Sequence, residues 1–285
     1  MEPHSKVLIT GMNGFTGEQL AKVLSESGFE CVGLGCDLLD RNSVFSEVRK
    51  SQPDFVVHLA GISFAAEQDI DSIYRINIVG TVNLLDALKD LSVKPKKVIL
   101  ASSAAVYGNV SVTSLSEVLC PKPTNHYGCS KLAMEHVATN YFDQFPIIIT
   151  RPFNYTGIGH SERFLIPKII HAYREKLPAI TLGNLDISRE FNDVRDVISV
   201  YRLLLMSEEQ SCIVNICSGR SISLFEIIEA MNGISGLSME VVSSQEFARG
   251  NEIKDLSGDD SMLKRMLGYS FRYQLQDTLK YMFNY

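Results

Sequence analysis

Three side chains in the middle of the chain could act together on one carbonyl group. Ser103 follows the apolar run Lys97 to Ala101, which is typical of a buried parallel strand. Tyr127 and Lys131 are four residues apart at the start of a helical stretch, so they share one face of a helix. A hydroxyl, a phenol and an ammonium that converge on a carbonyl favour redox chemistry on an alcohol or a ketone.

The ammonium of Lys131 could allow Tyr127 to exchange a proton near neutral pH. A phenol has a pKa near 10, and a positive charge about 4 Å away at an effective dielectric near 20 contributes roughly 4 kcal/mol, or about three pKa units. We therefore expect Lys131 to lower the pKa of Tyr127. Tyr127 would then serve as the acid or base of the reaction.

The N-terminal segment carries a second, independent motif. The apolar stretch Lys6 to Thr10 predicts a strand, and Phe15 to Ser27 predicts a helix. Between and just inside them, glycines at 11, 14 and 17 allow a tight turn, a close approach to a pyrophosphate, and packing of the helix on the strand. A diphosphate would then lie at the helix N-terminus, which indicates a dinucleotide-binding unit.

Apolar runs of strand length alternate with helical stretches from Lys6 to about Phe153, the pattern of a parallel sheet covered by helices on both faces. The predicted fold class is α/β, a doubly wound parallel (Rossmann) sheet with a smaller C-terminal substrate-binding lobe. We assign residues 1–154, with returning segments at about 190–217, to the dinucleotide-binding domain. Residues 155–189 and 218–285 form the predicted lobe.

Composition and charge narrow the classes of partner. The net charge of −6 without blocks of like charge argues against nucleic acid and lipid surfaces. No apolar run approaches 18 residues and the N-terminus lacks an apolar signal region, so we expect a cytoplasmic protein that does not enter membranes. The six cysteines show no paired spacing, and the six histidines form no ligand-spaced set, which predicts reduced thiols and no metal site.

Several further stretches resemble the extended short-chain dehydrogenases/reductases, the epimerase/dehydratase group that acts on nucleotide sugars. Residues 10–17 are similar to the Thr-Gly-x-x-Gly-[Phe/Tyr]-x-Gly motif of that family, and residues 58–61 to its His-x-Ala-[Ala/Gly] motif. Residues 77–81 resemble Asn-x-x-Gly-Thr, and residues 151–157 resemble Arg-x-x-Asn-x-x-Gly. Residues 183–197, 214–219 and 251–259 most resemble the 4-keto reductases that make GDP-6-deoxy-D-mannose.

This resemblance implies a catalytic trio, a cofactor and a substrate. Ser103, Tyr127 and Lys131 would be catalytic, and the cofactor would be NAD(P)H. A nucleotide-diphosphate sugar would be the partner, with Arg189 and Arg249 clamping its diphosphate. The implied cofactor-binding residues are Gly11, Asn13, Gly14, Phe15, Thr16, Gly17, Asp37, Leu38, Leu59, Ala60, Gly61, Asn77, Ala101, Ser102, Tyr127, Lys131, Pro152 and Phe153, and the substrate-binding residues are Ser63, Ser103, Asn154, Phe164, Lys168, Arg189 and Arg249.

The function that the resemblance implies is hydride transfer from NAD(P)H to the keto carbon of an NDP-4-keto-6-deoxyhexose, GDP- or dTDP-linked. Family dehydratases carry an acid and a base directly after the catalytic Ser or Thr, where this chain has Ala104 and Ala105. An NAD-dependent nucleotide-sugar 4-epimerase remains the alternative, because it needs only Ser, Tyr, Lys and a retained NAD. It is disfavoured by Ser63, where similar UDP-galactose epimerases have a lysine that grips the cofactor.

The segment after the second strand is shorter than the family pattern. The strand Cys31 to Gly35 runs almost directly into Asp37-Leu38-Leu39-Asp40, whereas family members usually insert a helix and a strand there. Asp37 can hold the adenosine ribose, since it lies 20 residues after Gly17, or it can match the family aspartate at the adenine amino group, which we favour. The ribose position then falls at Gly35, where no acid would repel a 2′-phosphate, so we expect NADPH to be accepted.

The resemblance also implies a homodimer. Apolar residues recur at helical spacing in Ile73 to Leu88 and in Leu132 to Tyr141. In the family such helices pair across a two-fold axis, although the same pattern suits ordinary helices that face a core. The sequence alone favours neither reading.

Overall fold

Six parallel strands form the central sheet of the computed structural model, which describes residues 5–63, 69–110, 112, 114–183, 187–243 and 255–285. The chain runs from β1 to β2 in one direction and from β3 to β11 in the other, so the strand order reverses between β1 and β3. This reversal confirms the predicted doubly wound sheet, and it marks the edge where such sheets bind ligands. In spatial order the strands are β11 (Cys212–Ile216), β6 (Ile147–Pro152), β4 (Lys97–Ala101), β3 (Phe55–His58), β1 (Lys6–Thr10) and β2 (Glu30–Gly33).

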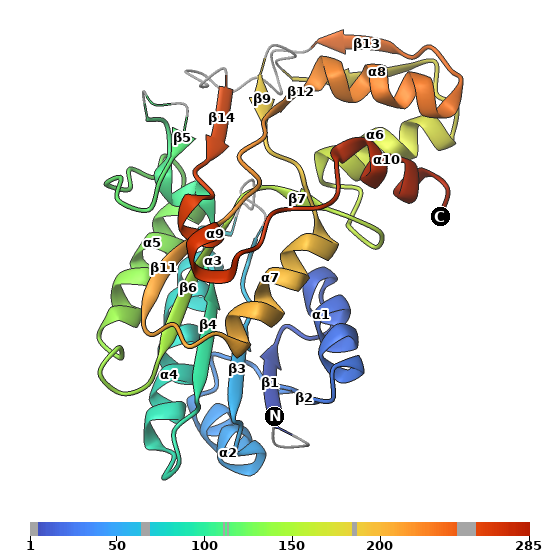
Figure 1. Cartoon of the computed structure of the whole chain (residues 1–285). Helices are drawn as coiled ribbons and strands as arrows, with labels where there is room; N and C mark the ends of the chain where they lie inside the picture. Colours follow the sequence, from blue (N-terminus) through green and yellow to red (C-terminus); the bar gives the residue numbers. More distant parts are fainter. Residues whose placement is uncertain (1–4, 64–68, 111, 113, 184–186, 244–254) are drawn as a thin grey trace.

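Helices cover both faces of the sheet (Figure 1). Leu24 of α1 and Val197 of α7 lie in the apolar core on one face, while Val44 of α2, Leu84 of α4 and Met134 of α5 lie in the core on the other. The strands between them are apolar on both sides because both sides are buried. The first face has α1 (Phe15–Glu26) and α7 (Val194–Met206), with the short helix α9 (Ser261–Leu267) beside them. The second face has α2 (Arg41–Ser51), α4 (Thr81–Asp90) and α5 (His126–Thr139), with three short segments beside them: α3 (Ile70–Tyr74), the π-helix η1 (Arg75–Gly80) and the 3₁₀ helix η2 (Ala104–Tyr107).

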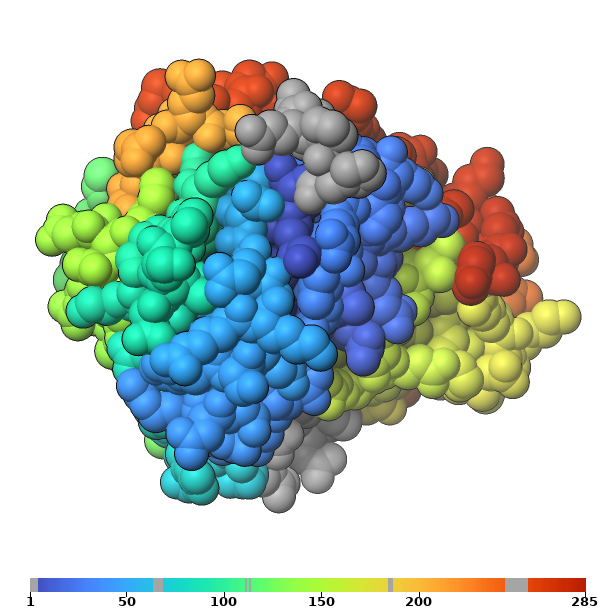
Figure 2. Space-filling view, turned by 90° about the horizontal axis from the view of Figure 1, so that it is seen from below, coloured from blue at the N-terminus to red at the C-terminus, as the bar shows by residue number. Residues whose placement is uncertain are grey.

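The connection from β2 to β3 holds only the helix α2, so the predicted shortening is confirmed. The Asp40 carboxylate caps α2 by accepting from the backbone N–H of Ser43 at 3.2 Å. Among the strands that the structure describes, none pairs with the outer side of β2, so β2 is an edge of the sheet. In the view from below, the N-terminal strands and helices, in blue and light blue, make up much of the surface (Figure 2).

The remaining elements gather at the upper end of the molecule in Figure 1, beyond the carboxyl ends of the large sheet. Their core joins Ile169 of α6, Leu182 of β8, Ile227 of α8 and Leu279 of α10. Three small sheets complete this region, in the orders β12-β9-β14-β5, β13-β8 and β10-β7. These elements are β5 (Ser114–Leu115), β7 (Tyr155–Thr156), α6 (Leu165–Arg174), β8 (Ala179–Leu182), β9 (Ser188–Arg189), β10 (Asn192–Asp193), β12 (Ile222–Ser223), α8 (Leu224–Ser235), β13 (Glu240–Ser243), β14 (Asp255–Gly258) and α10 (Leu275–Phe283).

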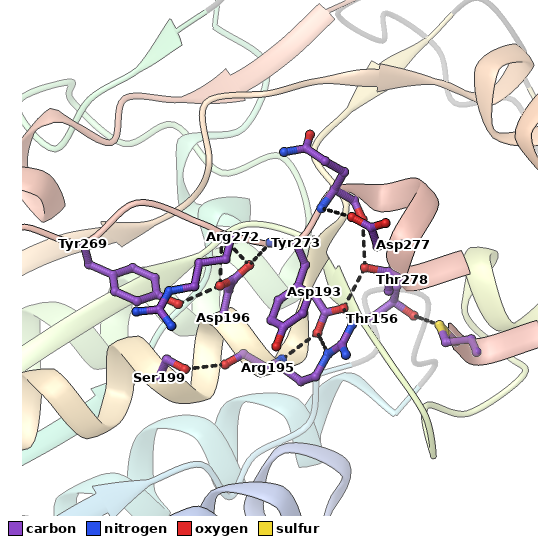
Figure 3. A network of polar contacts seen from close by, with 12 residues as sticks. Thr156, Asp193, Arg195, Asp196, Ser199, Tyr269, Arg272, Tyr273, Asp277 and Thr278 are labelled. Atoms are coloured by element: carbon purple, nitrogen blue, oxygen red, sulfur yellow. Dashed lines mark hydrogen bonds and ion pairs between the residues drawn. The ribbon is translucent and has the colours of Figure 1, made fainter. Parts of the chain in front are cut away.

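The segment of residues 269–283, called here the C-terminal segment, is tied to the first turn of α7 (Figure 3). The buried carboxylate of Asp196 accepts from the Tyr269 hydroxyl at 2.6 Å and from the backbone N–H groups of Arg272 and Tyr273 at 3.0 to 3.1 Å. The Thr278 hydroxyl donates to the Asp193 carboxylate at 2.7 Å. Asp193 and Asp196, at the N-terminal end of α7, therefore hold the C-terminal segment in place between the large sheet and the upper region.

Leu263 of α9 and Tyr269 pack in the same core as β1 and α7. The sequence-based division into lobes places both residues in the substrate-binding lobe, and the division stays a prediction. None of the helices in the described residues combines the length and apolar character needed to span a bilayer.

Candidate active site

The glycine-rich turn between β1 and α1 has the close contacts that only glycine permits. Gly11 adopts a positive φ of 69°, and a Cβ on Gly17 would lie 2.2 Å from the carbonyl oxygen of Gly11. Gly14 begins α1 without a side-chain cap. The first-turn N–H groups of α1 can therefore serve the diphosphate of a dinucleotide, as the motif predicted. The residues present fit the cofactor that the sequence implies.

Tyr127 and Ser103 meet where α5 packs on η2. The side chain of Asn125 caps α5 by accepting from the Gly128 N–H at 2.8 Å. A Cβ on Gly128 would lie 2.6 Å from the carbonyl oxygen of Ala105, so glycine lets the two elements approach closely. The side chain of Ser103 lies near enough to the Tyr127 hydroxyl to affect its pKa. The structure thus brings these two predicted catalytic residues together.

The side chain of Lys131 lies beside the carboxyl ends of β3 and β4. Its Nζ donates to the carbonyl oxygen of Ala101 at 2.8 Å, and it would lie 3.3 Å from a Cβ on Gly61. Burial lowers the pKa of Lys131 to about 8, and the carboxylate of Glu135 partly opposes this shift. Lys131 therefore joins the predicted cofactor residues Gly61 and Ala101 to the helix that carries Tyr127.

The expected effect of Lys131 on Tyr127 is not what the structure shows. Burial raises the pKa of Tyr127 to about 12, with the hydrogen bond from Ser103 acting in the opposite direction. The prediction from charge alone was wrong because it left out the loss of water around the phenol. Tyr127 therefore stays protonated at neutral pH, which a proton donor requires.

Asn77 is placed by a π-helix. Its Oδ1 accepts from the Ile62 N–H at 2.9 Å, and its Nδ2 donates to Ser130 Oγ at 3.0 Å. A Cβ on Gly61 would lie 2.7 Å from Asn77 Oδ1. Asn77 therefore connects the loop after β3 to α5, and the π-helix η1 is a local irregularity of the kind often found at functional sites.

A buried chain of hydrogen bonds, which the sequence analysis missed, runs beneath this site. His58 Nδ1 lies 2.6 Å from Thr10 Oγ1, and His58 Nε2 lies 2.9 Å from Thr81 Oγ1. Burial, and then the charge of Lys131, lowers the pKa of His58 to about 3, so the ring is neutral. Because the Thr81 hydroxyl donates to the carbonyl oxygen of Asn77, Nε2 carries the ring proton and Nδ1 accepts from Thr10. The only sequence signal was the position of His58 in a family motif.

A buried ion pair supports the ends of β4 and β6. The Arg151 guanidinium forms two bonds with the Glu135 carboxylate, at 2.6 and 3.0 Å, and Glu135 also accepts from the Ser102 hydroxyl at 2.5 Å. The Glu135 carboxylate raises the pKa of Arg151, against the effect of burial. The Arg151 guanidinium also lies 4.8 Å from the centre of the Tyr107 ring. This pair holds Ser102 beside the predicted catalytic Ser103.

Aromatic rings link the glycine-rich turn to the upper region. Phe15 stacks on His160 with ring centres 4.4 Å apart, and His160 stacks on Phe164 at 4.3 Å. The Tyr155 hydroxyl lies 2.8 Å from Thr16 Oγ1. The predicted cofactor residues Phe15 and Thr16 thus contact the same aromatic cluster as the predicted substrate residue Phe164.

The other predicted substrate residues are more scattered. Lys168 of α6 donates to the carbonyl oxygen of Thr181 at 3.2 Å, and Arg189 of β9 donates to that of Ser188 at 2.8 Å. Asn154 and Ser63 are exposed. Arg249 lies outside the described residues. The hydrogen bonds given above do not join Lys168 or Arg189 to Tyr127. The roles of these two residues, and those of Asn154, Ser63 and Arg249, stay predictions.

Pro152 and Phe153 lie at the end of β6, where Phe153 N donates to the carbonyl oxygen of Ile216 at 3.0 Å. Asn13 is exposed in the glycine-rich turn. Leu59 and Ala60 approach the same turn, because a Cβ on Gly11 would lie 2.9 Å from Ala60 N. The predicted cofactor residues of β1, β3, β4 and β6 therefore share the carboxyl edge of the sheet.

The predicted cofactor residues Asp37 and Leu38 lie beyond the end of β2. Asp37 is exposed and accepts from the Leu39 N–H at 2.9 Å, and Asn83 of α4 donates to the carbonyl oxygen of Leu38 at 2.8 Å. Gly35 donates its N–H to the Glu47 carboxylate of α2 at 2.8 Å. The sequence analysis found no acid at Gly35 itself, because this carboxylate comes from the following helix.

Comparison with known proteins finds relatives along nearly the whole chain. The family model described as GDP-mannose 4,6 dehydratase matches residues 34–282. The GDP-6-deoxy-D-talose 4-dehydrogenase of Aggregatibacter actinomycetemcomitans is 37% identical over 273 residues, which cover 94% of this chain and 93% of that enzyme. The GDP-6-deoxy-D-mannose reductase of Pseudomonas aeruginosa is 31% identical over 290 residues, covering 96% and 95%.

Solved structures and epimerases complete the comparison. The structure of RMD from Pseudomonas aeruginosa in complex with NADPH superposes with a TM-score of 0.90 at 29% identity, covering 98% of both chains. UDP-glucose 4-epimerases are relatives as well. That of Mycoplasma genitalium is 31% identical over 216 residues, which cover 70% of this chain and 62% of that enzyme.

Proposed function

Because the chain belongs to the extended short-chain dehydrogenases/reductases, in the family described as GDP-mannose 4,6 dehydratase, we propose that it is a nucleotide-sugar 4-keto reductase. Its substrate is an NDP-4-keto-6-deoxyhexose, and the names of the two curated relatives favour the GDP-linked form over the dTDP-linked form. The observation that carries the proposal is the position of the Ser103 side chain near the Tyr127 hydroxyl, with the ammonium of Lys131 at the end of β4.

The mechanism follows from the protonation states of these residues. When bound, NAD(P)H supplies the hydride for the keto carbon. Tyr127 donates its phenolic proton to the carbonyl oxygen as negative charge develops there, and Ser103 donates a hydrogen bond to the same oxygen. Ketone, hydride and proton together give the alcohol. Lys131 would hold the ribose next to the nicotinamide, because its ammonium can donate hydrogen bonds to the ribose hydroxyls.

Substrate binding is proposed for the scattered residues. Arg189 and Arg249 clamp the diphosphate, since a guanidinium recognises phosphate oxygens in pairs. Asn154 and Ser63 donate to the sugar, while Phe164 and Lys168 face the base. The aromatic contact of Phe164 with His160 supports a place beside the glycine-rich turn.

Dehydration and epimerisation are the competing reactions of this family. Ala104 and Ala105, in η2 directly after Ser103, have methyl side chains that cannot move protons. A 4-epimerase is compatible with Ser103, Tyr127 and Lys131, and it is the alternative function. It would retain its NAD through both half-reactions and consume none.

Cofactor turnover distinguishes the two functions. The purified protein is expected to be largely free of cofactor and to oxidise NADH or NADPH in a 1:1 ratio with GDP-4-keto-6-deoxy-D-mannose. The sugars named for the two curated relatives, 6-deoxy-D-talose and 6-deoxy-D-mannose, are epimers at C4, so NMR of the product identifies the face that receives the hydride. Interconversion of UDP-glucose and UDP-galactose without added cofactor would instead establish the epimerase.

The proposal extends to assembly and location. We propose a homodimer formed through α4 and α5, a two-lobed division at the boundaries given above, and a cytoplasmic location. Six free cysteines are consistent with a reducing compartment. Exposed Ile70 and Val79 beside these helices support the dimer surface.

A further inference from the structure

The Glu47 carboxylate is held at the carboxyl end of β2 by the backbone of Gly35. Its Oε2 accepts from the backbone N–H of Gly35 at 2.8 Å. The Cys36 thiol lies near the same carboxylate, and burial followed by the charge of Glu47 raises the pKa of that thiol. A side chain from the second turn of α2 thus brings a negative charge to a strand end that carries no acid of its own.

This strand end adjoins the glycine-rich turn. A Cβ on Gly33, the last residue of β2, would lie 2.9 Å from the terminal methyl of Met12. Leu38 lies against Gly80, because a Cβ on Gly80 would lie 3.0 Å from Leu38 Cβ. The end of β2 beside such a turn is where a dinucleotide-binding sheet meets the adenosine ribose. The Glu47 carboxylate is therefore beside the ribose position rather than on a remote surface.

The arginines of the same helix do not supply a counter-charge to this position. Arg41 Nη1 donates to Asp86 at 2.6 Å, and Arg49 Nη2 donates to Asp90 at 2.6 Å. Both acceptors are on α4, so these cations are directed across the helix pair. Among the contacts described, the charge at Gly35 is that of a carboxylate.

We propose that Glu47 selects the dinucleotide, favouring the unphosphorylated adenosine ribose of NADH over the 2′-phosphate of NADPH. The inference rests on the proposed function, since it concerns the cofactor of the same site. A carboxylate accepts hydrogen bonds from ribose hydroxyls, whereas it repels a phosphate that carries more than one negative charge. The residue that discriminates between NADH and NADPH thus belongs to α2 and not to β2.

Binding of ADP-ribose and 2′-phospho-ADP-ribose tests this inference without any turnover, because neither compound carries a nicotinamide. Calorimetry with the full chain is expected to show ADP-ribose binding at least tenfold more tightly. Glu47→Gln keeps an oxygen acceptor for Gly35 N–H but removes the charge, so the ratio should fall to about threefold or less. Glu47→Lys should reverse the preference.

Two matched variants serve as controls. Glu30→Gln removes the same charge at the opposite end of β2 and should leave the ratio unchanged. Asp37→Asn removes the acid that the sequence offered for the ribose, and it should change both affinities together. Thermal denaturation verifies that each variant is folded.

The possible failures are distinct. Wild-type protein that binds 2′-phospho-ADP-ribose as tightly as ADP-ribose would overturn the role of Glu47. A ratio that responds to Asp37→Asn and not to Glu47→Gln would do the same. If folded wild-type protein bound neither compound, both this inference and the proposed function would fail.

Discussion

Tyr127 is buried, and its hydroxyl lies near the side chain of Ser103. We expect Tyr127→Phe to preserve folding and dinucleotide binding, because only the hydroxyl is lost. Turnover of the keto sugar should fall by two or more orders of magnitude, the scale of losing a positioned acid. Steady-state kinetics beside calorimetric dinucleotide binding measure the two effects.

A suitable control is Tyr74→Phe, which removes a hydroxyl that hydrogen-bonds His126 at 3.1 Å. This variant should keep turnover within about twofold of wild type, as expected for a surface change. Near-normal activity of Tyr127→Phe would remove the phenol from the mechanism.

The pH dependence of reduction should follow Lys131. Reduction needs a protonated donor, and Tyr127 with a pKa of about 12 stays protonated over the working range. Lys131 has a pKa of about 8, so its charge is present below that pH and is lost as the pH rises through it. We expect kcat/KM for reduction to be level below pH 8 and to fall above it.

Lys131→Arg tests the assignment because a guanidinium does not titrate in this range. Its kcat/KM, although lower, should show no decline between pH 7 and pH 10. A wild-type profile that stays level to pH 10 would contradict the role given to Lys131.

Among the elements, the first turn of α7 connects the large sheet to the upper region. Replacing Asp196 with alanine leaves the Tyr269 hydroxyl and two backbone N–H groups without their buried acceptor. The expected loss is about 3 kcal/mol or more, which lowers Tm by roughly 5–10 °C for a chain of this size. Thermal denaturation measures the shift, and limited proteolysis should cleave the C-terminal segment first.

Asp71→Ala is the matched control, since the exposed Asp71 is 3.7 Å from Arg75 on the surface. Its free energy of unfolding should change by about 0.5 kcal/mol or less. Equal shifts in the two variants would show that the C-terminal segment does not depend on α7.

The elements nearest the glycine-rich turn could be predicted because their signals are local. The strand over Lys6–Thr10, the helix from Phe15, and the strand over Lys97–Ala101 appear where the sequence predicted them. The strand expected at Cys31 to Gly35 ends instead at Gly33, where the chain turns toward Asp37. The π-helix at Asn77 was not predicted, since apolar spacing over so few residues does not separate it from an α-helix.

The side-chain contacts of the site were less predictable than its residues. Glu47 reaches Gly35, and His58 lies between Thr10 and Thr81, through contacts between segments that are 12 to 48 residues apart. Such pairs leave no local pattern in a single sequence. The pKa of Tyr127 was missed for a similar reason, because burial depends on every element packed around the ring.

Considering the whole molecule, the proposed dimer makes the surface beside α4 and α5 an interface. Val79 of η1 is 46% exposed. We expect light scattering to give about twice the chain mass of 31.7 kDa, and Val79→Glu to shift the protein toward monomer by placing charge in an apolar contact. Val242→Glu introduces the same side chain at a site that is 44% exposed on β13 and should leave the mass unchanged. A monomeric wild-type protein would exclude the dimer.

The strand order of the large sheet also determines when, during synthesis, the edge of the sheet at β6 becomes covered. Five strands of the large sheet lie within residues 6–152, but β11, which pairs with β6, begins at Cys212, and Tyr269 enters the same core later still. A ribosome that has released only the first 200 residues therefore carries a sheet whose outer strand, β6, has an open edge. We expect such stalled nascent chains to be cleaved rapidly by protease within β4 and β6, and chains that have released Tyr269 to resist. Translation speed between β6 and β11 thus sets how long this edge is exposed to chaperones and to other nascent chains.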